Sequence, residues 1–473
     1  MKTLLKYLAY VIIISSFFRI IPVIAAVFYN ESPVNFVFTF LLSLGLGFLI
    51  LKIEKKMEGK AEPLSLTQGL MLVALSFIIL SLIGMISFLP SFGYNFINAL
   101  FESVSGFTTT GLTLYSSLDS LPKSLLLWRA ETQWIGGIGI IMVFLFILSR
   151  LKAHTYSRVG EAESKIETTV SLYQAQGFPQ KLEQNFKKTI TNIMIVYSGY
   201  TVIGLALLFA AGMPFFDSIA MSFTSLSTGG FAVTDAFYSN SLQLFILSAL
   251  MILGSISFIA HNRLLQKNIR GFLSSFEKNV FFIMIIASIL IVFAAYRDIG
   301  VVAFQLVSAF TTTGYSIAPI HLLPQIFILF IMAGMIIGGG IASTSGGIKV
   351  FRFYYILKSI PWVLKKLSLP ANAVIPFKIK GMEVEEKSLL MIVLFVFCYL
   401  LVLFAGTVVF MLFGHSFLNS SFQIVSALGT VGMQTMELAG INWLCKTVLI
   451  IAMLLGRLEI FPLLVLVRKL FVK

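Results

Sequence analysis

Four short strings rich in threonine and glycine are the residues of this sequence best suited to binding a small cation. The strings align without gaps, and each ends in a glycine that is followed by a bulky apolar residue. In chain order they are string 1, Ser105–Gly111 (SGFTTTG); string 2, Thr224–Gly230 (TSLSTGG); string 3, Ser308–Gly314 (SAFTTTG); and string 4, Ser426–Gly432 (SALGTVG). Carbonyl oxygens of extended loops around an axis replace the hydration shell of a monovalent cation, and threonine hydroxyls add ligands. Glycine suits the narrowest point because it has no Cβ and reaches backbone angles that other residues avoid.

A short apolar segment precedes each string: Phe96–Val104, Phe215–Phe223, Val301–Val307 and Phe417–Val425. Each segment is too short to cross a bilayer, so it predicts a re-entrant half-helix whose partly negative C-terminal end points toward the cation. Non-helical backbone at membrane depth is tolerated only where it is buried in protein or lines a water-filled path. Four such loops predict one shared axis, whereas any one string alone is also compatible with an ordinary outer turn.

The composition places these strings in a membrane protein. The chain has 473 residues, of which 58% are hydrophobic and only 11% are charged, and its apolar residues form long runs. Ten runs approach the length that crosses about 30 Å of hydrocarbon as a helix: residues 8–28, 36–51, 70–88, 125–148, 190–211, 242–260, 281–295, 326–348, 389–413 and 444–467. The first two runs have no small-residue cleavage site between them, so we expect the first run to be a retained span.

The basic residues predict the orientation of the spans. The formal net charge is +14, and most of the lysines and arginines fall in alternate loops, namely residues 52–60, 150–188, 263–278 and 349–387. The opposite side carries few, such as Lys123 and Arg297. The positive-inside rule therefore predicts a multi-pass protein of a bacterial-type cytoplasmic (inner) membrane with both termini in the cytoplasm. Because the charge is spread over loops rather than gathered in one patch, no nucleic-acid partner is indicated.

Together these patterns predict an all-α membrane fold with internal repeats. A two-span extension (1–62) precedes four membrane-pore-membrane units, repeats 1 to 4 (63–160, 161–275, 276–375 and 376–473), each of which contains one string. Each unit is expected to run helix, half-helix, extended loop, helix. The prediction is ten transmembrane helices and four re-entrant pore loops around a pseudo-fourfold pore.

A run of small residues interrupts the second span of repeat 3. It contains Gly338, Gly339, Gly340, Ser343, Thr344, Ser345, Gly346 and Gly347. Glycines are poor helix formers and small polar side chains satisfy broken backbone bonds, so a break in the helix is predicted here. A close-packing glycine face is the alternative. A phosphate loop is not indicated, since the G-x-x-x-x-G-K-[ST] frame is missing.

Arg457 is a charge in the middle of the last apolar run. At the helical rise it lies roughly 16 Å from either end, too far for the side chain to reach the membrane surface. An intramembrane charge is by default functional, and below a filter it would set an electrostatic barrier to cations. The alternative is a buried salt bridge with Glu459 or Glu437.

Further motifs carry a resemblance to a known family. They are Leu127–Arg129 (LWR), Gln133–Gly137 (QWIGG), Gly338–Lys349 (GGGIASTSGGIK) and Gly456–Glu459 (GRLE). With the four strings they cover nearly the whole chain, which resembles the Trk/Ktr/HKT superfamily of potassium and sodium uptake proteins. The two extra N-terminal spans make it most like the Trk membrane (pore) subunit.

The resemblance implies potassium uptake through one selectivity filter. The filter glycines would be Gly111, Gly230, Gly314 and Gly432, flanked by Thr109, Thr110, Thr228, Gly229, Thr312, Thr313, Thr430 and Val431. Glycine at all four positions fits the potassium-selective branch, and the departures in string 4 imply fewer hydroxyl ligands there. The run from Gly338 to Gly347 would be a movable gate and Arg457 the barrier. The resemblance also implies a homodimer and a cytoplasmic nucleotide-binding regulatory subunit, with potassium as the transported substrate and no organic cofactor.

Rival functions remain. Channel-like flow is possible because the membrane potential supplies about 2.3 kcal/mol per charge per 100 mV, and a sodium- or proton-coupled cation symporter is the alternative. A membrane-embedded enzyme is the distant alternative, since the histidines are scattered and neither H-E-x-x-H nor G-x-S-x-G occurs. The basic loops, including Lys365–Lys366 and 378–387, are candidate docking surfaces for the regulator, or they reflect the positive-inside rule alone.

Overall fold

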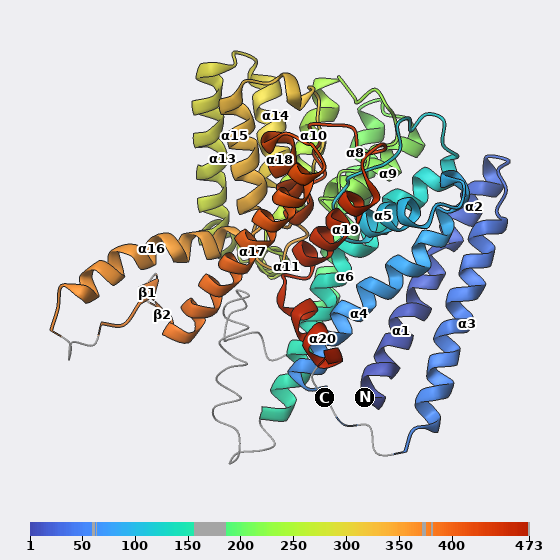
Figure 1. Cartoon of the computed structure of the whole chain (residues 1–473), viewed down its shortest axis with the longest axis horizontal. Coiled ribbons are helices and arrows are strands. Elements are labelled where there is room, and N and C mark those ends of the chain that lie inside the picture. The colour runs from blue at the N-terminus through green and yellow to red at the C-terminus, as the bar shows by residue number, and fades with distance from the viewer. Residues whose placement is uncertain (59–61, 63, 156–185, 371–374, 380–381, 472–473) are drawn as a thin grey trace.

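The fold is almost entirely helical (Figure 1). The structure is a computed structural model that describes residues 1–58, 62, 64–155, 186–370, 375–379 and 382–471. Within these ranges the only strands are β1 (Lys378–Ile379) and β2 (Met382–Glu383), which pair antiparallel. Some predicted features lie outside the described residues. They are the boundary at 160/161, residue 63 of the boundary at 62/63, Lys60, Lys380 and most of the basic segment 150–188.

The N-terminal extension forms a helical hairpin at one side of the molecule. Helices α1 (Lys2–Phe18) and α2 (Ile20–Phe28) follow one another through Arg19, and α3 (Val34–Lys56) returns beside α1 (Figure 1). Arg19 is fully buried, and its guanidinium lies over the ring of Trp128 at 4.9 Å. The extension is thus attached to repeat 1 through a buried cation–π contact.

Each repeat contains one 12-residue helix that ends inside its string. We name them pore helices after the predicted membrane-pore-membrane units: α5 (Phe96–Phe107), α9 (Phe215–Leu226), α14 (Ile299–Phe310) and α18 (Phe417–Leu428). The predicted half-helices were therefore too short, because the first three residues of every string are helical. In a buried site these residues keep their backbone bonds by continuing the helix, and each helix ends two residues before a left-handed threonine.

Longer helices flank the pore helices. The first helices of the repeats are α4 (Leu66–Gly84), α8 (Phe186–Ala210), α13 (Phe276–Ala295) and α17 (Glu386–Leu412). The second helices are α6 (Lys123–Thr155), α10 (Ser241–Ser255), α15 (Gln325–Ile337) and α19 (Trp443–Arg457). Short elements complete the described chain: η1 (Met85–Ser87), η2 (Pro90–Phe92), α12 (Ile269–Leu273) and η3 (Ile320–Leu322).

Three of the second helices stop part-way, which corrects the prediction of single straight spans over 242–260 and 444–467. Helix α10 bends by 99° into α11 (Phe258–Leu265), and α19 bends by 110° into α20 (Phe461–Phe471 in full). At the second bend Glu459 and Ile460 take left-handed backbone angles. In repeat 3, α15 ends at Ile337, as the glycine run predicted, and the chain continues through a non-helical 338–349 loop into α16 (Val350–Leu367).

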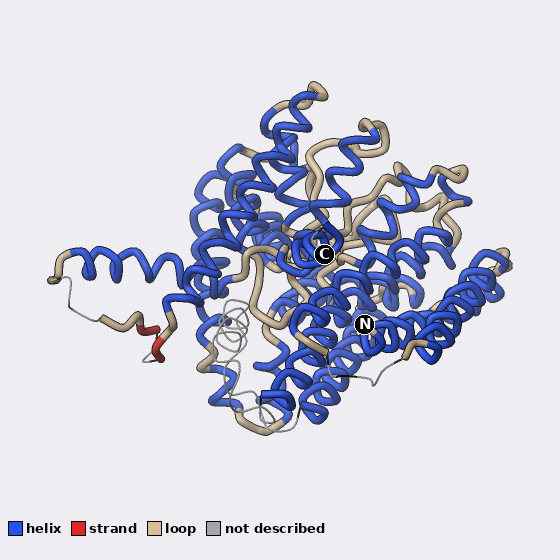
Figure 2. The backbone as a smooth tube through the Cα atoms, turned by 60° about the horizontal axis from the view of Figure 1, so that its bottom comes forward, coloured by secondary structure: helices blue, strands red, loops and turns tan. Residues whose placement is uncertain are grey.

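Helix α16 and the β1–β2 pair project away from the rest of the described chain in both views, and Figure 2 shows non-helical segments running between the helices near its middle. Six helices of the described residues are long and apolar enough to cross a membrane, or up to eight if each bent pair is one span. The count of ten spans therefore stays a prediction.

Glycines on the second helices allow close packing against the ends of the pore helices. A Cβ on Gly136 would overlap the carbonyl oxygen of Phe107, and Gly254 and Gly456 lie in the same way against the carbonyls of Leu226 and Leu428. Each of these three carbonyls belongs to the last residue of a pore helix. The pairs fix the depth at which the pore helices end.

We expect Gly136→Ala to lower the melting temperature of the purified protein. The added methyl group would lie 2.7 Å from the Phe107 carbonyl carbon, so the backbone must shift, at a cost of about 1–3 kcal/mol. Gly139→Ala is the matched control, since no atom lies within 4 Å of its Cβ position and alanine favours a helix by about 1 kcal/mol. Equal melting temperatures for the two variants would contradict the packing assignment.

Candidate functional site

The four strings share one backbone conformation. Thr109, Thr228, Thr312 and Thr430 have φ of 53°, 50°, 57° and 50°, and two residues later Gly111, Gly230, Gly314 and Gly432 have φ of 83°, 77°, 93° and 96°. These angles are left-handed, where glycine is favoured. Gly230, and not its neighbour Gly229, is the residue of string 2 that matches the other three glycines.

These four glycines form a closed ring, called the glycine ring below. A Cβ on any of them would overlap a carbonyl oxygen of the next string, in the pairs Gly111 with Gly229, Gly230 with Thr313, Gly314 with Val431 and Gly432 with Thr110. Each carbonyl belongs to the residue just before the next ring glycine. The repeats therefore follow one another around the ring in chain order, and string 4 returns to string 1.

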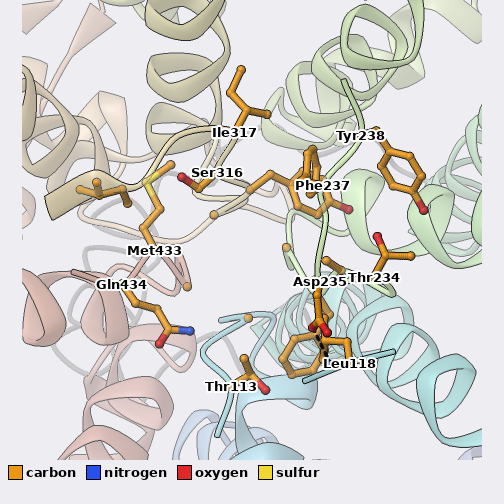
Figure 3. Close-up of a pocket in the computed structure, with 18 of the residues that line it drawn as sticks. Thr113, Leu118, Thr234, Asp235, Phe237, Tyr238, Ser316, Ile317, Met433 and Gln434 are labelled. Atoms are coloured by element: carbon orange, nitrogen blue, oxygen red, sulfur yellow. Dashed lines mark hydrogen bonds between the residues drawn. The ribbon is translucent and has the colours of Figure 1, made fainter. Parts of the chain in front are cut away.

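One cavity opens onto the whole ring. Its volume is about 720 Å³, and its lining includes all four ring glycines. Figure 3 shows that the side chains around it come from the segments after the four strings, among them Thr113, Asp235, Ser316 and Gln434. A single path therefore reaches all four strings from the side on which the chain leaves them.

Asp235 places a negative charge on the wall of this cavity. Its carboxylate accepts hydrogen bonds from the Leu118 backbone N–H (2.6 Å) and the Ser117 hydroxyl (2.7 Å). These bonds lower the pKa of Asp235 below its usual value, with the Leu118 N–H as the larger cause. The carboxylate is therefore ionised at neutral pH, and its charge attracts cations.

In strings 1 and 3, two threonine hydroxyls of the same string bond to each other and support it. The hydroxyls of Thr108 and Thr110 lie 2.8 Å apart, and those of Thr311 and Thr313 do the same. The equivalent pairs are Ser227 with Gly229 in string 2 and Gly429 with Val431 in string 4. Because the strings follow chain order around the ring, the two supported strings face each other, and the ring is fourfold in backbone but twofold in side chains.

A buried ion pair lies behind the first string. The Arg129 guanidinium is 2.9 Å from the Glu102 carboxylate, and neither side chain is more than 1% exposed. Glu102 also accepts from the Thr113 hydroxyl and the Leu114 backbone N–H, while Arg129 donates to the Ala232 carbonyl in repeat 2. The sequence reasoning missed Glu102, although an acid inside an apolar half-helix was a signal that could have revealed it.

The 338–349 loop lies against the strings on the side away from the cavity. The Gly346 N–H donates to the Thr312 hydroxyl at 2.7 Å, and the Thr344 hydroxyl lies 3.2 Å from that of Thr228. A Cβ on Gly346 would overlap the Gly429 carbonyl. The loop therefore touches strings 2, 3 and 4 at once.

Arg457 holds this loop. It is the last residue of α19 rather than the middle of a straight span, and its buried guanidinium donates to the carbonyls of Thr344, Gly136 and Gly137. The predicted alternative, a salt bridge to Glu459 or Glu437, is wrong for the described residues. Glu459 pairs with Arg352 instead, and Glu437 accepts from Ser116.

Comparison with known proteins assigns the family. The family model TrkH, described as a cation transport protein, matches residues 43–296 and 292–472. This chain belongs to the TrkH family. It is thus a membrane subunit of the Trk/Ktr/HKT superfamily, as the motifs suggested, and a transporter of cations rather than an enzyme.

Individual relatives match the TrkH-family chain over nearly its full length. An uncharacterized cation transporter of Methanocaldococcus jannaschii is 31% identical, with 99% of this chain and 96% of the relative aligned. The Trk system potassium uptake protein TrkH of Salmonella typhimurium is 29% identical, with 99% of each chain aligned. The crystal structure of the potassium transporter TrkH from Vibrio parahaemolyticus superposes with a TM-score of 0.86 at 25% identity, covering 100% of this chain and 99% of that chain.

Removing one partner of the Glu102–Arg129 pair should strongly destabilise the protein. Arg129→Met leaves the Glu102 carboxylate buried and unpaired, which costs about 3–5 kcal/mol, whereas replacing both partners with apolar residues is often nearly neutral. We therefore expect the melting temperature of Glu102→Leu/Arg129→Met to exceed that of Arg129→Met alone.

The control for this experiment is Lys366→Met, which breaks the Lys366–Glu386 pair, 45% and 65% exposed. An exposed pair contributes about 0–1 kcal/mol, so its loss should change little. A double variant that is no more stable than Arg129→Met would contradict the account of the buried pair.

Proposed function

We propose that this chain takes up potassium across the cytoplasmic membrane through the glycine ring. The observation that carries the proposal is the closed ring itself, in which four backbone strings meet below a cavity with an ionised carboxylate on its wall. Backbone carbonyls arranged around an axis are the ligand set that replaces the hydration shell of potassium. The printed names of the relatives, several of them potassium uptake proteins, support the choice of ion.

The proposed filter uses backbone and hydroxyl oxygens in layers. Four carbonyls lie at the ring, those of Thr110, Gly229, Thr313 and Val431. A threonine precedes each of these residues in the chain, namely Thr109, Thr228, Thr312 and Thr430. The hydroxyls of Thr109 and Thr430 are buried without a hydrogen-bond partner among the described residues. A buried hydroxyl without a partner is costly, so an ion or a water in the path would satisfy it.

The proposed gate is the 338–349 loop with Arg457. In the described conformation the loop lies across strings 2, 3 and 4. Arg457 adds a fixed positive charge, and its guanidinium donates a hydrogen bond to the Thr344 carbonyl of the loop. Opening would require the loop to leave its partners, among them the carbonyls of Leu226 and Gly254 that accept from the Thr344 hydroxyl. Movement of the loop would thus admit ions that the structure holds back.

The remaining features of the proposal concern the assembly. We propose ten spans, four re-entrant pore loops, cytoplasmic termini, a homodimer and a separate nucleotide-binding regulatory subunit. The projecting α16 with Lys365 and Lys366 supports a docking surface for such a subunit, since it stands away from the other helices (Figure 1). Transport through this assembly is driven by the membrane potential, at about 2.3 kcal/mol per charge per 100 mV.

Proton-coupled symport is the second candidate. It is favoured by Glu131 on α6, whose two carboxylate oxygens are buried without a hydrogen-bond partner among the described residues. Intramembrane carboxyl groups of this kind serve proton relays. Potassium uptake that collapses when an imposed proton gradient is removed, at constant membrane potential, would favour this candidate.

We expect Gly111→Ser to weaken potassium selectivity. Its Cβ would overlap the Gly229 carbonyl at a left-handed position, so two neighbouring strings must shift. The measurement is the flux of potassium, rubidium, sodium and lithium into liposomes that contain the purified protein. The wild type should favour potassium and rubidium, and the variant should lose roughly tenfold in the potassium-to-sodium ratio, which corresponds to 1.4 kcal/mol.

The control for Gly111→Ser is Gly440→Ser, where no atom lies within 4 Å of the Cβ position. Its selectivity should equal that of the wild type. Equal passage of sodium through the wild type, or an unchanged ratio in Gly111→Ser, would mean that the ring glycines are packing residues and not a filter.

Arg457→Ala should speed potassium flux in the same liposomes without changing the order of ion preference. The substitution removes both the fixed positive charge and the bonds that hold the loop at Thr344. Arg457→Lys keeps the charge and is expected to stay close to the wild-type rate. A rate that is unchanged in the alanine variant would exclude Arg457 as the barrier.

A further inference from the structure

String 2 differs from the other strings at two positions that matter for its shape. Gly229 stands where strings 1 and 3 have Thr110 and Thr313. Thr224 stands where the other three strings begin with serine. The backbone of string 2 nevertheless follows the same path, with left-handed Thr228 and Gly230. Another group must therefore support it.

In strings 3 and 4 the first serine holds the ring glycine. Its hydroxyl accepts from the backbone N–H of Gly314 or Gly432, at 3.1 Å in each case. Thr224 makes no such bond among the described residues, because its hydroxyl lies 2.5 Å from that of Tyr315 and donates to the Ala220 carbonyl. String 2 lacks this hydroxyl support, and its Gly230 N–H donates to the Thr224 backbone carbonyl at 3.4 Å instead.

Gln133 supplies the support from the neighbouring repeat. It lies on α6 and is fully buried. Its Nε2 donates to the Gly229 carbonyl at 2.6 Å, and its Oε1 accepts from the Phe231 N–H at 3.1 Å. One amide therefore holds the backbone on both sides of Gly230.

Gln133 also occupies the space that a side chain at position 229 would need. A Cβ on Gly229 would overlap the Gln133 side-chain amide and lie 2.8 Å from its Cβ. Gly229 has no left-handed φ, so space and not backbone conformation excludes a side chain there. The glutamine and the glycine are thus a complementary pair.

We propose that Gln133 is a positioning residue that sets the ion specificity of the glycine ring. This inference rests on the proposed function of the ring as a filter. The Gly229 carbonyl lies between Gln133 and Gly111 and accepts a hydrogen bond from the glutamine amide. Among the described residues, no hydrogen bond is donated to the other three ring carbonyls, those of Thr110, Thr313 and Val431. The ring therefore has three carbonyls free to follow the ion and one that is held.

The consequence concerns the size of the ion. A filter discriminates by the number and field strength of its carbonyls and by how far they can move inward. A carbonyl that is tied to a buried amide resists moving toward a smaller cation, since that movement would break a hydrogen bond at a buried site. Gln133 thus disfavours sodium at string 2.

The test uses the full-length protein in liposomes with potassium and sodium as the probes. Gln133→Met keeps the length of the side chain and removes both hydrogen bonds, so we expect the potassium-to-sodium flux ratio to fall about tenfold. Gln243→Met is the matched control, because Gln243 on α10 is a buried glutamine that donates to the Ala211 carbonyl, which lies outside all four strings. Its ratio should not change.

A size exchange tests the pair even if Gln133→Met folds poorly. Gly229→Thr alone should impair flux by its clash, and Gln133→Ala alone should lower the ratio. The double variant Gln133→Ala/Gly229→Thr relieves the clash but leaves the carbonyl at position 229 without its amide donor, so its flux should recover while its ratio stays as low as that of Gln133→Ala. A double variant with the wild-type ratio would overturn the proposal, as would an unchanged ratio in Gln133→Met.

Gly111→Ser, measured in parallel, separates this inference from the function on which it rests. If Gly111→Ser lowers the ratio while every Gln133 variant keeps it, the filter stands and the role of Gln133 is wrong. If neither change affects the ratio, the proposed filter itself is wrong, and the inference fails with it.

Discussion

The contact on which the rest of the structure depends is the approach of each ring glycine to a backbone carbonyl of the next string. At all four positions a single added carbon would overlap that oxygen, so the ring closes only with glycine. The strings meet this closely because their pore helices end at the same place in each repeat. Gly136, Gly254 and Gly456 on the second helices then fit against those helix ends, and the ring thereby determines the packing of the surrounding helices.

Charges buried around the ring hold separate repeats together. Arg129 pairs with Glu102 inside repeat 1 and joins that repeat to repeat 2 through the Ala232 carbonyl, and Arg457 joins repeat 4 to repeats 1 and 3 through backbone carbonyls. An isolated charge in an apolar medium is costly, so each guanidinium specifies the position of its acceptors. Helix α6 carries Arg129, Gln133 and the two glycines that accept from Arg457, so it contacts both the proposed filter and the proposed gate.

The side chains reduce the symmetry that the backbone establishes. Strings 1 and 3 have threonine pairs, string 2 has Gln133 from a neighbouring repeat, and string 4 has Val431 where a hydroxyl would otherwise stand. The 338–349 loop adds to this difference, since it contacts strings 2, 3 and 4. A chain of four unequal repeats can thus hold each quarter of one ring by different means.

Local patterns in the sequence were enough to determine the membrane class and the register of the four strings, because apolar length and the order of threonine and glycine act over a few residues. The break after Ile337 was predictable for the same reason, since glycines stop a helix where they stand. The tertiary structure decided where the pore helices end, where α10 and α19 bend, and which groups bind Arg457. It also brought Gln133 to Gly229, which lie 96 residues apart, and Arg457 to Gly136, which lie 321 apart. Such contacts depend on how whole repeats pack around one axis, and no pattern within a single repeat contains that information.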